Sequence, residues 1–384
     1  MTNSSRQFAL KSFAASLLLV ILCGCGSDPS KEYKKGEVAF ENSDYNTAVE
    51  RFSSVLETSP DNVDALVMLA RSEFALAHLD KADDALNRAS ATNGSDADII
   101  ELKAQIAFYR KDYKAATGYY AQLASNPDFD DETRSRGWTG LGAIDFFMIG
   151  LHPDVQRYRH ESRVKFLQAV ILDRRNASAR YHLGRLYRDT FQYLEAAKDE
   201  FDIYVHLQPV VDKRVKKIRD EVLPSLKDEI ARNSVPTSRV DSPACASFLK
   251  QGDDAYRRKN WKAAVTAYSK AYKKDSGSFP AAVGLARSYA HSARTAFNRD
   301  EALKMYLVAC KVRPSAIGTY IEAGDYAVTV GKPATAVELY SRALASNPES
   351  KPAVNGLILA LTKSGDSQAA SVYRGYLRTL SDAK

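Results

Sequence analysis

The sequence predicts an all-α fold in which a pair of helices is repeated along the chain. A spacing of 34 residues recurs, Ala and aromatic residues keep fixed offsets within it, and turn residues separate helix-length segments. The 384 residues are 45% apolar and 26% charged, as in ordinary folded proteins. Four cysteines, without zinc-ligand spacing, exclude a disulfide scaffold and a zinc finger.

The N-terminus has the layout of a secretory signal peptide. Arg6 and Lys11 precede an uncharged, mostly apolar stretch that begins at Ser12. This stretch ends at Ser27 and is shorter than the roughly 20 residues that span a bilayer as a helix. No later segment of that length lacks charge, so we expect no permanent transmembrane helix.

The end of this segment, Leu22-Cys23-Gly24-Cys25, resembles the bacterial lipobox. The resemblance implies that residues 1–24 are a lipoprotein signal peptide and that Cys25 becomes the acylated N-terminus. Several acyl chains, each buried CH₂ contributing about 0.8 kcal/mol, would hold the protein on a membrane. Gly26 rather than Asp follows Cys25, which implies the periplasmic face of the outer membrane. The alternative is an ordinary signal peptide with incidental cysteines.

The repeat is visible as Ala48, Phe52 and Val55, followed 34 residues later by their counterparts Ala82, Leu86 and Ala89. The same pattern continues at Ala116, Tyr120, Leu123, then Ala264, Tyr268, Ala271, then Ala302, Tyr306, Ala309, then Ala336, Tyr340, Ala343, and finally Ala370.

This spacing resembles the tetratricopeptide repeat (TPR), and Trp138, Leu141 and Gly142 match the first part of its pattern. Small residues at fixed positions allow two antiparallel helices to approach closely, and a bulky residue fills the groove between neighbours. The resemblance covers nearly all of the mature chain and implies a TPR solenoid, an αα superhelix of about nine helix pairs. The pairs start near residues 29, 63, 97, 135, 177, 245, 279, 317 and 351.

Two units depart from the pattern. The fourth has about eight extra residues, which include 148–153 and predict a longer loop between its helices. The fifth needs one extra residue in its turn to bring Ala197, Phe201 and Tyr204 into register.

A polar segment divides the repeats into two arrays. Residues 210–233 are charged and predicted to be helical, with Pro224 expected to end or kink the helix. Residues 233–243 are polar and contain two prolines, so they are predicted to be a linker. This gives an N-terminal array of about five repeats plus a helical extension (25–232) and a C-terminal array of about four (244–384).

No motif for catalysis, a metal or a cofactor stands out, and we expect neither enzyme activity nor a cofactor. The glycines near Trp138 do not match a nucleotide-binding loop, and His152 and His160 are expected to be solvated loop residues. Cys245 and Cys310 would be the only thiols left after lipidation. Buried free thiols are favoured over a bridge between them.

Positive charge is concentrated in residues 151–220, which hold fifteen Lys or Arg and ten Asp or Glu. There Tyr181, Arg185 and Arg188 are spaced to share one helix face. In the TPR family the first helix of each pair lines a concave groove. By that register the candidate partner-binding residues are Arg71, Phe74, Phe108, Tyr181, Arg185, Arg188, Asp253, Tyr256 and Arg287.

Two interpretations of these residues remain open. In the first, the groove receives an acidic or C-terminal segment of a partner, with Arg pairing its carboxylates. In the second, which is favoured, the faces are solvated and Arg185 and Arg188 pair with Asp189 or Glu195. The family's carboxylate clamp is not supported, because Tyr33 and Glu37 occupy its positions. The basic run 213–219 is expected to be a solvated helix rather than a lipid contact.

The leading hypothesis is a non-enzymatic adaptor, a lipid-anchored periplasmic lipoprotein that holds protein partners of the cell-envelope machinery and binds no nucleic acid. One alternative is a cell-wall glycan-binding or glycan-processing protein that uses the irregular fourth unit. Another is a structural homo-oligomer.

Overall fold

The computed structural model describes residues 28–152, 155–208, 210–233, 243–292 and 295–382. They fall into two compact units that divide between Phe129 and Asp130. The predicted signal peptide and the predicted lipidation site Cys25 lie outside the described residues. Among the described helices, none is both long enough and apolar enough to cross a bilayer.

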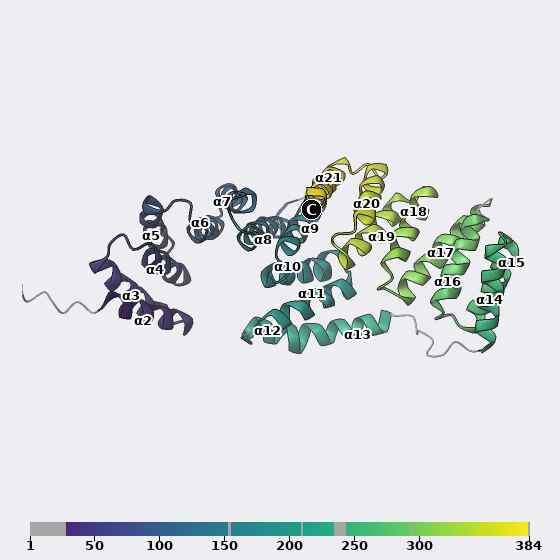
Figure 1. The fold of residues 1–384 in the computed structure, drawn as a ribbon, viewed down its shortest axis with the longest axis horizontal. Coiled ribbons are helices and arrows are strands. Elements are labelled where there is room, and N and C mark those ends of the chain that lie inside the picture. Colours follow the sequence, from purple (N-terminus) through teal and green to yellow (C-terminus); the bar gives the residue numbers. More distant parts are fainter. Residues whose placement is uncertain (1–27, 153–154, 209, 234–242, 293–294, 383–384) are drawn as a thin grey trace, which may run out of the picture. The chain divides into compact units, whose positions relative to one another are not determined.

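The first unit consists of three helical hairpins in sequence (Figure 1). Its helices are α2 (Pro29–Glu41), α3 (Tyr45–Thr58), α4 (Val63–Ala75), α5 (Leu79–Thr92), α6 (Ala97–Tyr109) and α7 (Tyr113–Ser125). The predicted starts at residues 29, 63 and 97 are therefore confirmed.

Glycine and aromatic residues set the distance between the helices of a hairpin. A Cβ atom on Gly36 of α2 would lie 2.7 Å from the ring of Phe52 on α3. Phe52 is fully buried, as is Ala48 one turn before it. The helices touch because no side chain separates them at Gly36, which is the packing that the repeat pattern predicts.

A residue with positive φ reverses the chain between the helices of each hairpin in this unit. Ser43, Ala77 and Lys111 have φ values of 62°, 61° and 63°. This left-handed conformation ends one helix, and the residue after it precedes the next. Asp112, for example, accepts a hydrogen bond from the backbone N–H of Ala115 at 3.0 Å and so caps α7.

The second unit begins with two long helices, α8 (Asp131–Met148) and α9 (Val155–Leu172). The longer connection that we predicted for this fourth unit is present, because residues 149–154 separate α8 from α9 whereas only residues 42–44 separate α2 from α3. It accounts for only part of the additional residues, and the helices themselves, with 18 residues each, take up the rest. The unit also starts at residue 131 and not at 135.

The fifth unit accommodates its extra residue in a π-helical turn. Helix α10 (Ala177–Leu186) continues as the π-helix η1 (Tyr187–Phe191), and Gln192 then has a φ of 55° before α11 (Leu194–Leu207). A π turn is the usual way in which one residue is inserted into a helix. The predicted insertion is present, but it widens the helix before the turn.

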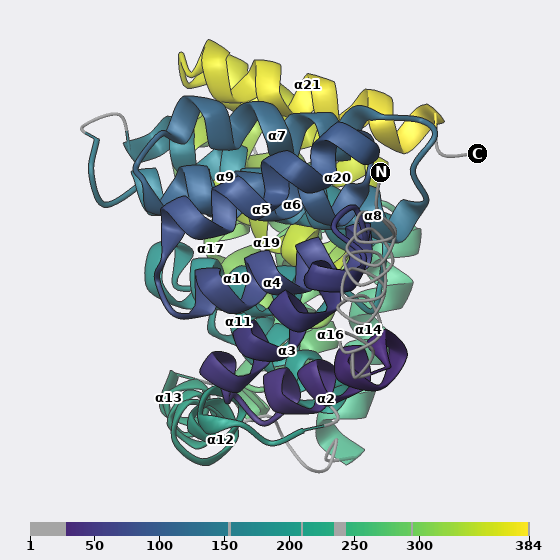
Figure 2. The same ribbon diagram turned by 90° about the vertical axis from the view of Figure 1, so that its left-hand side faces the viewer.

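The helical extension follows α11 as α12 (Lys213–Lys217), the π-helix η2 (Ile218–Val222) and α13 (Leu223–Asn233) (Figures 1 and 2). Of the two outcomes that we predicted at Pro224, an end or a kink, the helix does not end there, and the turn directly before it is a π turn. Pro224 lies in the first turn of α13, directly after η2, where the missing N–H is tolerated.

Four further hairpins complete the second unit. Their helices are α14 (Pro243–Arg257), α15 (Trp261–Lys274), α16 (Phe279–His291), α17 (Ala296–Val312), α18 (Ile317–Thr329), α19 (Pro333–Ser346), α20 (Lys351–Lys363) and α21 (Ser367–Asp382). The predicted starts at 279, 317 and 351 are confirmed. Within the expected linker 233–243, residues 234–242 lie outside the described residues.

The last helix returns to the beginning of this unit. Helix α21 packs against α9, and α19 approaches α11, so that one buried core extends from Val164 to Leu380 (Figure 1). The expected N-terminal array, 25–232, therefore spans both compact units, and the expected linker lies inside the second. The contacts of α21 with α9 and of α19 with α11 join helices α8–α13 to helices α14–α21 within the second unit.

Candidate functional site

The predicted residues Arg71, Phe74 and Phe108 lie on α4 and α6 of the first unit. Arg71 Nη2 is 3.0 Å from a carboxylate oxygen of Asp98. The ring of Phe74 packs edge-on against Tyr109 at 5.0 Å, and Tyr109 is 67% exposed. The first unit thus presents an accessible aromatic surface, while Arg71 is engaged in an ion pair.

Tyr181, Arg185 and Arg188 lie together near the π turn of the second unit. Arg188 donates to Asp189 at 2.6 Å, and Arg185 lies 3.7 Å from the same carboxylate. The ring of Tyr181 is covered by the Arg214 guanidinium of α12, 5.1 Å from its centre. Arg185 and Arg188 thus share the single carboxylate of Asp189, which is the pairing named in the solvated-face interpretation.

Asp253, Tyr256 and Arg287 line one cavity of about 660 Å³ in the C-terminal array. Its walls come from α14, α15, α16 and the turn after α17, and they comprise Asp253, Tyr256, Arg257, Tyr268, Phe279, Pro280, Val283, Gly284, Arg287 and Arg313. Of the predicted residues, these three are the set that the structure brings into a common cavity.

Two tyrosines in or near this cavity, Tyr268 and Tyr306, each donate a hydrogen bond to a carboxylate on the first helix of a hairpin. The Tyr268 hydroxyl lies 2.6 Å from Asp253 Oδ1. The Tyr306 hydroxyl lies 2.8 Å from Glu322 Oε1, and Arg287 donates to both oxygens of Glu322 at 2.8 and 2.7 Å. The tyrosine hydroxyls thus hold both carboxylates in place, and Arg287 balances the charge of Glu322.

Burial and these hydrogen bonds change the acidity of the groups. Burial raises the pKa of Tyr268, and the hydrogen bond to Asp253 raises it further. Burial opposes ionisation of Glu322, but hydrogen bonds from Arg287 and Tyr306 outweigh it and keep its pKa below the usual value. At neutral pH the tyrosines are protonated donors and Glu322 is a carboxylate.

Arg313 is the cation of this cavity that sequence reasoning missed. Its guanidinium lies 4.2 Å from the ring centre of Phe279, and it forms no ion pair with a described residue. Arg313 follows α17 and is not at a groove position of a first helix, so the family register gives no signal for it. An exposed, unpaired guanidinium on an aromatic ring is available to an anionic ligand.

An aromatic stack supports the other wall. The Trp261 ring stacks on His291 at 4.4 Å with an angle of 15°, and the Tyr256 hydroxyl lies 3.1 Å from His291 Nε2. Tyr256 is thus held in one orientation beside the cavity, which reduces the entropy lost when it binds a partner.

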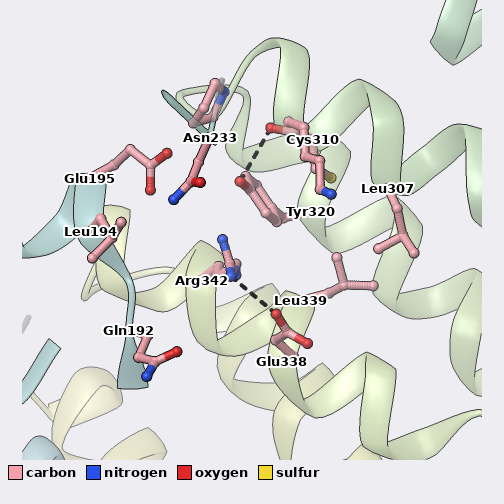
Figure 3. Close-up of a pocket in the computed structure, with 12 residues that line it drawn as sticks. Gln192, Leu194, Glu195, Asn233, Leu307, Cys310, Tyr320, Glu338, Leu339 and Arg342 are labelled. Carbon is pink, nitrogen blue, oxygen red and sulfur yellow. Dashed lines mark hydrogen bonds and ion pairs between the residues drawn. The ribbon is translucent and has the colours of Figure 1, made fainter. Parts of the chain in front are cut away.

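A second cavity, of about 300 Å³, lies where the two parts of the second unit meet (Figure 3). Glu195 of α11 and Asn233 of α13 face Tyr320 and Arg342 of α18 and α19. Arg342 pairs with Glu338 at 3.1 Å, and the Tyr320 hydroxyl donates to the Cys310 carbonyl at 3.3 Å.

The histidine and cysteine predictions can be compared with this structure. His160 is not a solvated loop residue, because it lies on α9, is 6% exposed and is 3.1 Å from the Tyr373 hydroxyl. Burial, followed by repulsion from Arg163 and Arg159, lowers its pKa to about 3. Cys245 and Cys310 are both buried and are not bridged to one another, which agrees with the favoured prediction.

The two units carry opposite net charges. Residues 28–129 contain 11 Lys or Arg against 18 Asp or Glu, a net charge of −7. Residues 130–384 contain 41 against 29, a net charge of +12. The excess in residues 151–220 is therefore only part of a basic second unit, while the first unit is acidic.

Comparison with known families identifies the repeat. Family profiles described as tetratricopeptide repeat match residues 39–106, 249–314 and 321–383, which together are just over half of the chain. The chain therefore belongs to the tetratricopeptide-repeat proteins. Arrays of this repeat mediate interactions between proteins and are in general not catalytic.

Several solved structures are similar. PilF of Pseudomonas aeruginosa is 15% identical with a TM-score of 0.39, over 66% of this chain and 94% of that chain. A thermophilic TPR protein of Thermus thermophilus, TTC0263, is 19% identical with a TM-score of 0.40, over 51% and 100%. PilW, a type IV pilus biogenesis factor, is 15% identical with a TM-score of 0.40, over 53% and 93%. No curated protein matches the sequence.

Proposed function

We propose that this protein is a membrane-anchored periplasmic adaptor whose C-terminal groove binds an anionic segment of a protein partner. The observation that carries this proposal is the cavity of about 660 Å³, where unpaired Arg313 lies on Phe279 across from the fixed Tyr256. Arginine pairs with carboxylates bidentately, and tyrosine adds contact area at a low entropic cost. An acidic or C-terminal peptide satisfies both features.

The anchor in this proposal is an acylated Cys25 at the periplasmic face of the outer membrane. It is supported by the sequence Leu22-Cys23-Gly24-Cys25 after an apolar segment, and by Gly26. Incorporation of radiolabelled palmitate tests it, with Cys25→Ser as the unlabelled control. If the wild-type protein takes up no label, the anchor is refuted while the groove is unaffected.

The groove is tested by recovery of partners from detergent-solubilised envelope. We expect Arg313→Glu combined with Tyr256→Ala to abolish recovery of the partner. Arg185→Glu combined with Arg188→Glu is the control, because these arginines pair with Asp189 outside the cavity. Equal recovery with both double variants would refute binding in this groove.

The envelope machinery is the class of partner that we propose, and mass-spectrometric identification of the recovered proteins tests it. The glycan-binding alternative is weakened on one point, because His160, one of the two histidines that it invoked, is buried. Failure to sediment with purified peptidoglycan is therefore expected. Light scattering over a range of concentrations tests the homo-oligomer.

A further inference from the structure

The hairpin α14–α15 and its turn carry seven exposed cations. They are Lys250, Arg258, Lys259, Lys262, Lys270, Lys273 and Lys274, here called the basic hairpin surface. None of them forms an ion pair with a described residue. The positive charges of such a cluster repel one another, and a bound polyanion would reduce this repulsion.

The acids of the same hairpin do not compensate for this charge. Asp253 accepts the hydrogen bond of Tyr268, and Asp254 pairs with Arg257. The basic stretch that begins with α12 differs, because it is flanked by Asp212, Asp220 and Glu221, and Arg219 pairs with Asp220. The two stretches differ in net charge. Residues 243–275 hold eight Lys or Arg against three Asp, a net charge of +5, whereas residues 210–221 hold five against three Asp or Glu, a net charge of +2.

The cations lie on the outside of the hairpin. Lys270 and Lys273 follow Lys262 by eight and eleven residues, close to two and three turns of a helix with about 3.6 residues per turn. Ala264 and Ala271, on the opposite side of α15, are fully buried. Lys262 and Lys273 therefore project away from the core, while the Lys270 ammonium lies 5.7 Å from the ring centre of Phe248 on α14 and remains exposed.

We propose that the basic hairpin surface docks on the anionic phospholipid headgroups of a bilayer. Six of its seven cations are lysines, flexible point charges that suit a diffuse anionic surface better than bidentate recognition of one carboxylate. An outward-facing surface can reach a flat bilayer without a cavity. This inference rests on the membrane location in the proposed function, but it is independent of the groove and of acylation.

Docking would fix the orientation of the second unit at the membrane. The surface belongs to the same hairpin as Asp253 and Tyr256, which line the groove. Binding of α15 to lipid would therefore fix the distance and orientation of the groove relative to the bilayer surface, so that a membrane-associated partner can bind to it.

Binding to vesicles tests the proposal without the anchor. The probe is phosphatidylethanolamine vesicles with about 30% phosphatidylglycerol, compared with phosphatidylcholine vesicles, and the protein is the mature chain from residue 25 carrying Cys25→Ser. We expect co-sedimentation with the anionic vesicles only, weakening as salt shortens the screening length from about 10 Å at 0.1 M to about 3 Å at 1 M.

Two triple variants with the same change in net charge locate the binding. Lys262→Glu, Lys270→Glu and Lys273→Glu remove the basic hairpin surface, and Lys213→Glu, Lys216→Glu and Lys217→Glu change the α12 stretch. We expect the first to lower partitioning by at least about tenfold and the second by less than about threefold. Circular dichroism and the melting temperature verify that both remain folded, and the matching Lys→Gln variants keep the test valid if either does not.

Three results would overturn the proposal. The wild-type protein fails to bind anionic vesicles, or the two triple variants lose binding equally, so that net charge alone is responsible. In the third, the protein ignores vesicles but self-associates at low salt, and the α15 variant abolishes this association. The occupant would then be the acidic first unit of a second copy. A loss of palmitate labelling would refute only the anchor.

Discussion

Arg163 on α9 donates its Nε hydrogen to the hydroxyl of Tyr373 on α21 at 2.7 Å, across 210 residues of sequence. Arg163 is fully buried, and no carboxylate pairs with it among the described residues. Its charge is instead met by the Tyr373 hydroxyl, by Ser341 at 3.2 Å and by the ring of Phe191 at 4.7 Å. The closure of the second unit therefore centres on a buried cation in a neutral, aromatic site.

Tyr373→Phe should destabilise the second unit by about 2–3 kcal/mol, because Arg163 would keep its charge and lose its main acceptor. Tyr376→Phe is a matched control on the same helix. The Tyr376 hydroxyl donates only to the neutral carbonyl of Pro348 at 2.9 Å, so its loss should cost about 1 kcal/mol. Urea denaturation measures both. Equal losses would mean that Arg163 does not depend on Tyr373.

Acidification should weaken the same contact through His160. Its pKa is about 3 in the folded protein against 6.5 for the free side chain, so the unfolded chain binds an additional proton between these values. Stability from this group is complete above about pH 6.5 and falls by about 2 kcal/mol at pH 5.

His160→Gln provides the comparison for that effect. The free energy of unfolding of the variant relative to wild type should rise by about 2 kcal/mol between pH 7.5 and pH 5. Asp145, whose pKa is raised by burial to about 6, works in the opposite direction but is present in both proteins and cancels. A difference that does not change with pH would contradict a neutral buried His160.

Gly356→Ala should cost about 1–3 kcal/mol by overpacking. A Cβ atom there would overlap Cε1 of Tyr340, whose ring is almost fully buried. Gly318→Ala is the control, because its Cβ would meet no atom within 4 Å. It should stabilise the helix by about 0.5–1 kcal/mol. Thermal unfolding would disprove the packing role if both substitutions changed the stability in the same direction.

Ala77→Gly should raise stability by about 0.5–1 kcal/mol. Ala77 ends α4 with a φ of 61°, a conformation that costs an L-residue about 1–2 kcal/mol and glycine almost nothing. Gly331, with a φ of 75° at the equivalent turn after α18, gives the reverse test. Gly331→Ala should lower the melting temperature, and no change in either variant would show that these turns relax.

Most of the fold can be predicted from the repeat. The helix starts at residues 63, 97, 279, 317 and 351 follow because each first helix needs a small residue facing a bulky one at fixed spacing. In the fourth unit the prediction was right only in part, because the added residues lengthen both helices as well as the connection between them. Local sequence does not determine how the added residues divide between helices and connection.

The closure and part of the site could not be predicted. Arg163 and His160 are polar residues on a helix, so the sequence suggests that they are exposed. They are buried by residues distant in the sequence, chiefly Tyr373 of α21. In the groove, the repeat pattern predicted that Asp253, Tyr256 and Arg287 line the concave side, and the structure places all three at one cavity. The pattern missed Arg313, which reaches that cavity from the end of α17.

The return of α21 to α9 also changes how this chain should unfold. In an open array each hairpin touches only its neighbours, so the terminal one can fray without disturbing the rest. Here the final hairpin packs against a helix that lies about two hundred residues earlier in the sequence. A force applied to the C-terminus must therefore break this contact before any repeat unfolds. The second unit should consequently respond to force in a single large step, and it should refold slowly, since its decisive contact joins distant parts of the chain.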